Sequence, residues 1–135
     1  MDREIKFRGK SLRNDEWLYG DLVHDNIGGS YVYPIDAEGL YKENKVSPNT
    51  VGQYTGLKDK NWVEIYEGDI LIWGENGHKS QPMTVVFKHG SFGYIYIEDW
   101  FHSFAGNTNF TFNPLNTDVR FEIVGNIHDN PELII

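Results

Sequence analysis

The 135-residue sequence contains no cysteine and no long hydrophobic run. The lack of cysteine excludes disulfides, thiolate zinc sites and cysteine nucleophiles. No apolar stretch approaches the roughly 20 residues that a membrane-spanning helix requires. The charged N-terminus, Met1 to Lys6, is not followed by the apolar core of a signal peptide. We therefore expect a soluble protein of a reducing cytoplasm that folds without disulfides.

Helix signals are also scarce, because few segments repeat apolar residues at helical spacing. Turn residues instead recur about every 8–12 positions, which is typical of an all-β sandwich or barrel. The sequence predicts strands at 4–9, 16–24, 30–35, 40–46, 53–57, 63–66, 69–73, 83–88, 92–97 and 120–127. Ser47-Pro48 and Asn130-Pro131 each place a capping residue before a proline, which predicts two single helical turns. Residues 99–118 are expected to form a long, partly structured loop.

These patterns predict a mainly β fold with little helix. An N-terminal β-meander region at residues 1–62 is expected to precede an SH3-type barrel at residues 63–135, the two packing as one compact unit. Glu67-Gly68-Asp69 is interpreted as the turn that starts the first barrel strand. Glycine permits the positive φ of a tight turn, and aspartate can accept hydrogen bonds from nearby backbone N–H groups.

Negative charge dominates the second half of the chain. The net charge is −8, and residues 61–135 carry three basic residues against ten acidic ones. Such a surface repels phosphate, so it disfavours nucleic-acid binding by this half. Residues 1–13, in contrast, carry five bases against two acids. An alternative hypothesis is therefore a nucleic-acid-associated module that uses Lys6, Arg8 and Lys10.

Several longer motifs carry a resemblance to a known family. They are Ile5-Lys6-Phe7-Arg8-Gly9-Lys10, Trp17-Leu18-Tyr19-Gly20-Asp21-Leu22, the stretch from Thr50 to Asn61, the stretch from Glu64 to Ile70, and the stretch from Val124 to Leu133. The chain resembles the YopX family of bacteriophage and prophage proteins over nearly its whole length. Trp62 is a departure, because the family pattern usually has glycine in that turn. The resemblance implies a β region followed by an SH3-type barrel, no known catalytic residue, and the cytoplasm of a bacterial host.

Motifs for catalysis, metals and cofactors are weak. The five histidines are scattered and none forms a zinc-binding pair at helical spacing. We therefore expect no metal site and no cofactor. A small hydrolase built on Asp99, His102 or Glu67 remains an unfavoured alternative, because a catalytic triad is defined by geometry rather than by adjacency.

Aromatic side chains are the best candidates for a binding surface. Those predicted to lie in or beside barrel strands are Trp73, Tyr94, Tyr96, Trp100 and Phe101. Most should fill the core, and any that are exposed together would mark an interface. The preferred hypothesis is a non-enzymatic phage accessory protein that binds a protein partner, or itself, through such aromatics.

Overall fold

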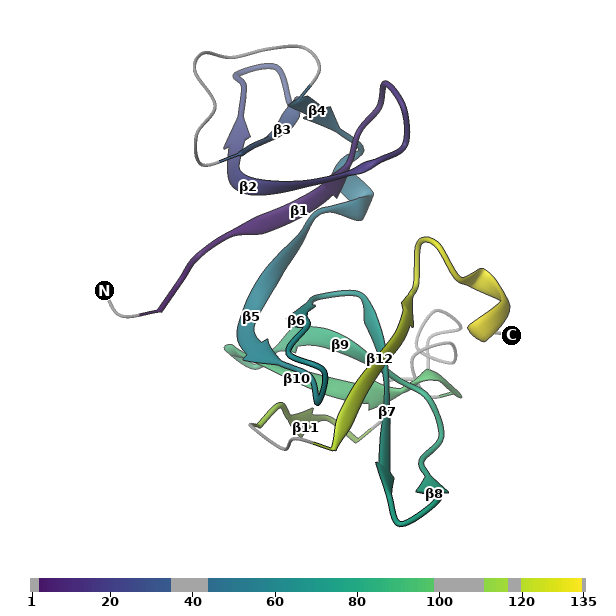
Figure 1. Ribbon diagram of the computed structural model, residues 1–135. Helices are drawn as coiled ribbons and strands as arrows, with labels where there is room; N and C mark the ends of the chain where they lie inside the picture. The colour runs from purple at the N-terminus through teal and green to yellow at the C-terminus, as the bar shows by residue number, and fades with distance from the viewer. Residues whose placement is uncertain (1–2, 35–43, 99–110, 117–119, 135) are drawn as a thin grey trace. The chain divides into compact units, whose positions relative to one another are not determined.

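The computed structural model describes residues 3–34, 44–98, 111–116 and 120–134 (Figure 1). Most of these residues lie in antiparallel strands, which confirms the mainly β prediction. The chain divides into two compact units, unit 1 at Met1–Gly56 and unit 2 at Leu57–Ile135. The domain limits expected from the sequence, 1–62 and 63–135, stay a prediction. Among the described residues, no helix has both the length and the apolar character required to cross a membrane.

Unit 1 is built on a curled antiparallel sheet. The sheet has six strands in the order β4-β3-β2-β1-β5-β6, of which β4 to β1 and most of β5 belong to unit 1. Their bounds are β1 Phe7–Lys10, β2 Trp17–His24, β3 Ser30–Tyr33, β4 Lys45–Val46 and β5 Gly52–Lys58. Val32 and Val46 are fully buried between them. Gly20 allows β2 to approach β3 closely, because a Cβ atom there would overlap the carbonyl oxygen of Tyr33.

Unit 2 contains a second antiparallel sheet, in the order β11-β10-β9-β7-β12 with β8 beside β7 (Figure 1). The bounds are β6 Glu64–Tyr66, β7 Asp69–Glu75, β8 His78–Lys79, β9 Met83–Lys88, β10 Ser91–Tyr96, β11 Asn113–Pro114 and β12 Phe121–Asn126. The last strand, β12, returns to pair with β7, and the SH3-type barrel expected from the sequence stays a prediction. The core comprises Ile65, Leu71, Met83, Val85 and Phe121.

The turn at Glu67-Gly68-Asp69 lies immediately before β7. Gly68 has a φ of 89°, and Asp69 is only 2% exposed. Asp69 Oδ2 accepts a hydrogen bond of 2.8 Å from the N–H of Tyr66. The carboxylate therefore closes the turn from inside, which accords with the structural interpretation of this motif.

The two helical turns form, but without the predicted side-chain caps. The 3-10 helices are η2 at Pro48–Thr50 and η3 at Pro131–Leu133, and neither Ser47 nor Asn130 makes a side-chain capping bond. The hydroxyl of Thr50 instead donates to the carbonyl of Ser47 and accepts from the N–H of Lys10. A 3-10 turn this short has few unpaired backbone N–H groups. A proline at its start is therefore sufficient to begin the turn without a side-chain cap.

Candidate binding site on the Asp59 loop

Residues 59–63, here called the Asp59 loop, join β5 to β6 in unit 2. The Asp59 side chain is 6% exposed, and its Oδ1 accepts from the N–H groups of Asn61 at 2.8 Å and Val63 at 3.0 Å. Its Oδ2 accepts from the N–H of Ile123 in β12 at 3.0 Å. The backbone closes the loop with a 2.8 Å bond from Asp59 N–H to the Val63 carbonyl. One buried carboxylate thus fixes both the shape of the loop and its attachment to β12.

A second loop of the same design joins β2 to β3 in unit 1. Asp25 Oδ1 accepts from the N–H groups of Ile27 at 3.0 Å and Gly29 at 2.6 Å. The Asp25 N–H donates to the Gly29 carbonyl at 3.0 Å. Both loops therefore have an aspartate at the first position and bonds from the third and fifth positions. Gly28 holds the fourth position with a φ of 90°.

Hydrogen bonding also shifts the pKa values of two side chains of the unit 1 loop and its following strand, Asp25 and Tyr31. The N–H of Gly29, and then the hydroxyl of Tyr31, hold the pKa of Asp25 below its ordinary value. Both donors favour the charged carboxylate. The Tyr31 hydroxyl lies 2.9 Å from Asp25 Oδ2, and the same bond raises the pKa of Tyr31.

Trp62 occupies the fourth position of the Asp59 loop, where the unit 1 loop has glycine. Its φ is 64°, in the left-handed region that a bulky side chain rarely adopts. Its side chain is 79% exposed, so the core does not explain why a large aromatic residue stands there. Trp62 is thus an exposed aromatic side chain in a strained conformation, carried by a loop that a buried carboxylate holds in place.

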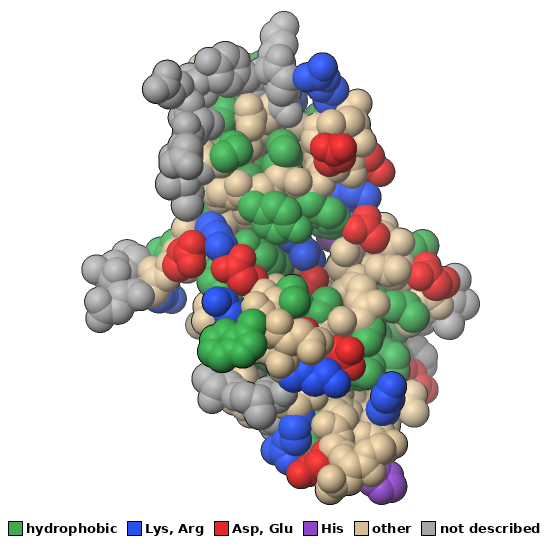
Figure 2. Space-filling view, in the orientation of Figure 1, with side chains coloured by type: hydrophobic (Ala, Val, Ile, Leu, Met, Phe, Trp, Pro, Cys, Tyr) green, Lys and Arg blue, Asp and Glu red, His purple; other side chains and the backbone are tan. Residues whose placement is uncertain are grey.

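The immediate surroundings of Trp62 combine apolar and basic groups. The Lys58 ammonium lies 5.5 Å from the centre of the Trp62 ring, within the range of a cation–π contact. Val63, the next residue, is 51% exposed. On the face shown in Figure 2, hydrophobic side chains are exposed among acidic and basic ones. The arrangement offers an aromatic contact with positive charge beside it.

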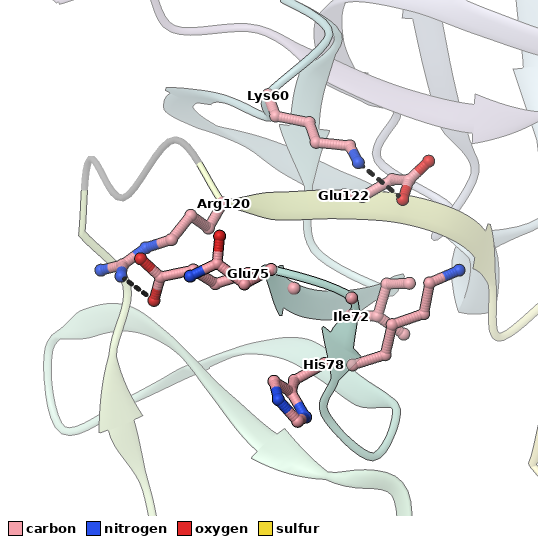
Figure 3. A pocket seen from close by; sticks show the side chains of 10 residues that line it. Lys60, Ile72, Glu75, His78, Arg120 and Glu122 are labelled. Atoms are coloured by element: carbon pink, nitrogen blue, oxygen red, sulfur yellow. Dashed lines mark hydrogen bonds and ion pairs between the residues drawn. The ribbon is translucent and has the colours of Figure 1, made fainter.

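An open depression of about 230 Å³ begins at Lys60, inside the same loop. Ile72, Glu75, His78, Arg120 and Glu122 line it further along β7, β8 and β12 (Figure 3). Lys60 forms an ion pair with Glu122 at 3.2 Å. The 2.8 Å ion pair of Arg120 with Glu75 points to the side away from Ile72, and the Arg120 guanidinium lies 4.5 Å from the centre of the Trp73 ring (Figure 3). Ile72 and Glu122 are paired in register, one position away from the core residues Leu71 and Phe121 and from the partly buried Ile123. This part of the depression therefore lies on the outer face of the sheet.

The structure separates the aromatic residues proposed from the sequence. Trp73 and Tyr94 are partly buried against the unit 2 core, and the Tyr94 ring packs on Phe121 at 5.4 Å. Tyr96 is 39% exposed at the end of β10. Trp100 and Phe101 lie outside the described residues. The assignment of these five residues to a binding surface stays a prediction.

The basic residues proposed from the sequence lie together on one face of unit 1. Lys6 contacts the Tyr54 ring, while Arg8 and Lys10 both lie over Trp17. Arg8 is only 6% exposed. Lys6 and Lys10 also form ion pairs with Glu4 and Asp15. Their charges are therefore engaged within the protein's own fold.

Only one residue of the hydrolase alternative, Glu67, lies within the described residues. Asp99 and His102 lie outside the described residues, and Glu67 belongs to the turn before β7. Within residues 3–34, 44–98, 111–116 and 120–134, no group of three His, Cys, Asp or Glu side chains could hold a metal ion.

Sequence reasoning noted Trp62 only as a departure from a pattern. A signal was nevertheless available, because Asp25 and Asp59 each stand in a turn between two predicted strands, with Gly28 and Trp62 three residues later. Comparing the two segments would have indicated that Trp62 occupies a glycine-like position.

Similarity to known proteins identifies the family of this chain. The YopX protein family model matches residues 6–135, so the chain belongs to the YopX family. The fold is similar to the crystal structure of protein EF1440 from Enterococcus faecalis, with a TM-score of 0.56 and 22% identity over 99% of this chain and 100% of that one. At this identity the likeness shows the fold alone. A comparison with curated proteins finds no match.

Proposed function

We propose that this YopX-family chain is a non-enzymatic module that binds another protein molecule through Trp62. The observation that carries the proposal is the combination of 79% exposure and a left-handed backbone at Trp62. The setting we propose is that of a phage or prophage accessory protein acting in the cytoplasm of the bacterial host.

The physical argument starts from the conformational cost. A left-handed backbone costs an L-residue about 1–2 kcal/mol, and the loop in unit 1 avoids that cost with Gly28. An exposed tryptophan recovers little of this by burial within its own chain. Tryptophan is enriched among the residues that dominate protein–protein binding energies. A contact between the Trp62 ring and a partner protein would explain why tryptophan stands at this position. The stability of the chain alone does not explain it.

Pre-organisation of the loop supports the same conclusion. The hydrogen bonds to Asp59 hold the backbone on both sides of Trp62 before any partner arrives. A partner therefore does not have to order this loop, which reduces the entropic cost of association.

Nucleic-acid binding through Lys6, Arg8 and Lys10 is the competing hypothesis. Their low exposure weighs against it, because Arg8 is 6% exposed and the side chains of Lys6 and Lys10 are 17% and 14% exposed, whereas that of Lys60 is 46% exposed. A mobility-shift titration at low salt decides, because binding through phosphate contacts is strongest there. A shift at low salt that Lys6→Gln and Lys10→Gln remove would support that hypothesis over ours.

The protein-binding proposal is tested with a photoreactive residue at Val63, beside the tryptophan. The full chain is irradiated in host-cell lysate and at rising concentration of the pure protein, and the oligomeric state is measured by light scattering. We expect a discrete crosslink, to a host or phage protein or to a second copy, that disappears in Trp62→Gly and persists in Lys88→Gln. A strict monomer with no Trp62-dependent crosslink would overturn the proposal.

A further inference from the structure

Most basic residues of unit 2 lie beside Trp62 or along the depression. Leu57–Ile135 contains five basic residues against eleven acidic ones. Four of the five lie beside Trp62 or line the depression, namely Lys58, Lys60, Lys79 and Arg120. The fifth, Lys88, lies elsewhere, in β9. The otherwise acidic unit therefore carries three lysines, Lys58, Lys60 and Lys79, beside Trp62 or along the depression, while the Arg120 guanidinium lies over the core-packed Trp73 ring.

The depression extends from the Asp59 loop along the outer face of β7 and β12. Lys60 belongs to the Asp59 loop and also lines the depression, where its side chain points toward Glu122 (Figure 3). Ile72 provides an apolar group in the depression. The name Trp62 strip is used here for Trp62, Ile72 and the three lysines Lys58, Lys60 and Lys79.

Resting on the proposed function, we infer that the Trp62 strip binds an acidic polypeptide segment of the partner. A large apolar side chain of that segment contacts the exposed Trp62 ring. Carboxylates placed next to it in the segment contact Lys60 and Lys79. Charge complementarity is the basis of this choice, since opposite charges steer association and set the register of the bound segment.

Single-stranded nucleic acid is a rival ligand, because it also combines flat rings with negative charge. The carboxylates near the strip distinguish it from a polypeptide. Glu122 and Glu75 lie in the depression and pair with Lys60 and Arg120. These two carboxylates would repel a continuous phosphate backbone, and the excess of acidic residues in the rest of the unit would add to the repulsion. A polypeptide can instead place its own N–H groups or a basic side chain opposite them. The observations therefore favour a polypeptide.

The inference is tested by selecting peptides from a random library on the immobilised full chain, with removal of those that also bind Trp62→Gly. Selected peptides and a mixed-sequence single-stranded oligonucleotide are then titrated by fluorescence anisotropy. The proteins are wild type, Trp62→Gly, Lys60→Gln combined with Lys79→Gln, and Lys88→Gln. The last variant removes a basic charge from the same unit but outside the strip.

We expect peptides that pair a large apolar residue with two or more carboxylates. Loss of a central aromatic contact should weaken binding about tenfold or more. The Lys60/Lys79 double variant should weaken binding several-fold and reduce its salt dependence, and Lys88→Gln should change the affinity less than twofold.

Three outcomes overturn the inference. Selected peptides that need Trp62 but carry no carboxylates would contradict it and leave the proposed function standing. Tighter binding of the oligonucleotide than of every peptide, with the same dependence on Trp62, would replace the polypeptide with nucleic acid. A library that yields no Trp62-dependent peptide would also reject it, while the crosslinking at Val63 judges the proposed function separately.

Discussion

Glycine and alanine at position 62 should reveal the conformational cost of the Asp59 loop. Both substitutions remove the same indole ring, so the effect of losing its packing largely cancels when the two variants are compared. Alanine retains the penalty of the left-handed backbone, about 1–2 kcal/mol. Glycine avoids that penalty, but the greater freedom of its unfolded chain lowers its stability relative to alanine by about 0.5–1 kcal/mol. Trp62→Gly should therefore be more stable than Trp62→Ala by about 0.5–1 kcal/mol.

The assay is equilibrium unfolding in urea. With a slope of about 2 kcal/mol per molar urea, the midpoints should differ by about 0.25–0.5 M. The unit 1 loop supplies an internal control, because a Cβ atom at Gly28 would meet no atom within 4 Å. Gly28→Ala should then be destabilised by a similar amount for the same backbone reason.

At positions with ordinary backbone angles, replacing glycine by alanine usually stabilises a protein. The sign of the difference is therefore the critical result. If Trp62→Ala is as stable as Trp62→Gly, or more stable, the backbone strain assigned to Trp62 is refuted.

Three further changes test hydrogen bonds and packing in the two units. Asp59→Ala leaves three N–H groups without their carboxylate and should reduce the free energy of unfolding by about 2–4 kcal/mol, measured by urea unfolding; a loss below about 0.5 kcal/mol would show that Asp59 does not hold the loop. Gly93→Ala would make a Cβ atom overlap the Phe112 ring and should cost about 1–3 kcal/mol by the same measurement, whereas an unchanged stability would contradict the packing of Phe112 on β10. Because the pKa of Asp25 is lowered in the folded chain, the stabilisation it gives is complete above the ordinary value of 3.8 and is lost as pH falls below it. The thermal midpoint of wild type should therefore decrease more steeply below that pH than the midpoint of Asp25→Asn, and parallel curves would count against this linkage.

The strands were largely predictable because their residues alternate and their boundaries carry turn residues. Met83–Lys88 was located with its observed limits, and β3 ends just before Pro34, as an edge or terminal proline requires. β8 was missed because a two-residue strand has no periodicity, and it depends on the positive φ values of Asn76 and Gly77 in the preceding turn.

The candidate site was less predictable, because exposure depends on the register of distant strands. Tyr94 and Tyr96 have the same alternation in the sequence, yet only Tyr94 packs on Phe121 of β12. The position of Lys60 in the depression likewise depends on pairing between β7 and β12, which the sequence does not specify. Trp62 could have been recognised through its counterpart Gly28, but its 79% exposure required the structure.

The most direct test of the central claim is the affinity of the crosslinked partner for three versions of the full chain. Wild type, Trp62→Gly and Lys88→Gln are titrated with that purified protein by calorimetry, or, if the crosslink joins two copies, are compared by their dimer dissociation constants. A residue that dominates an interface contributes about 2 kcal/mol or more, so Trp62→Gly should bind about 30-fold more weakly while Lys88→Gln remains close to wild type. An affinity of Trp62→Gly within about twofold of wild type would contradict the account, because an effect that small lies within the range of energetically neutral contacts.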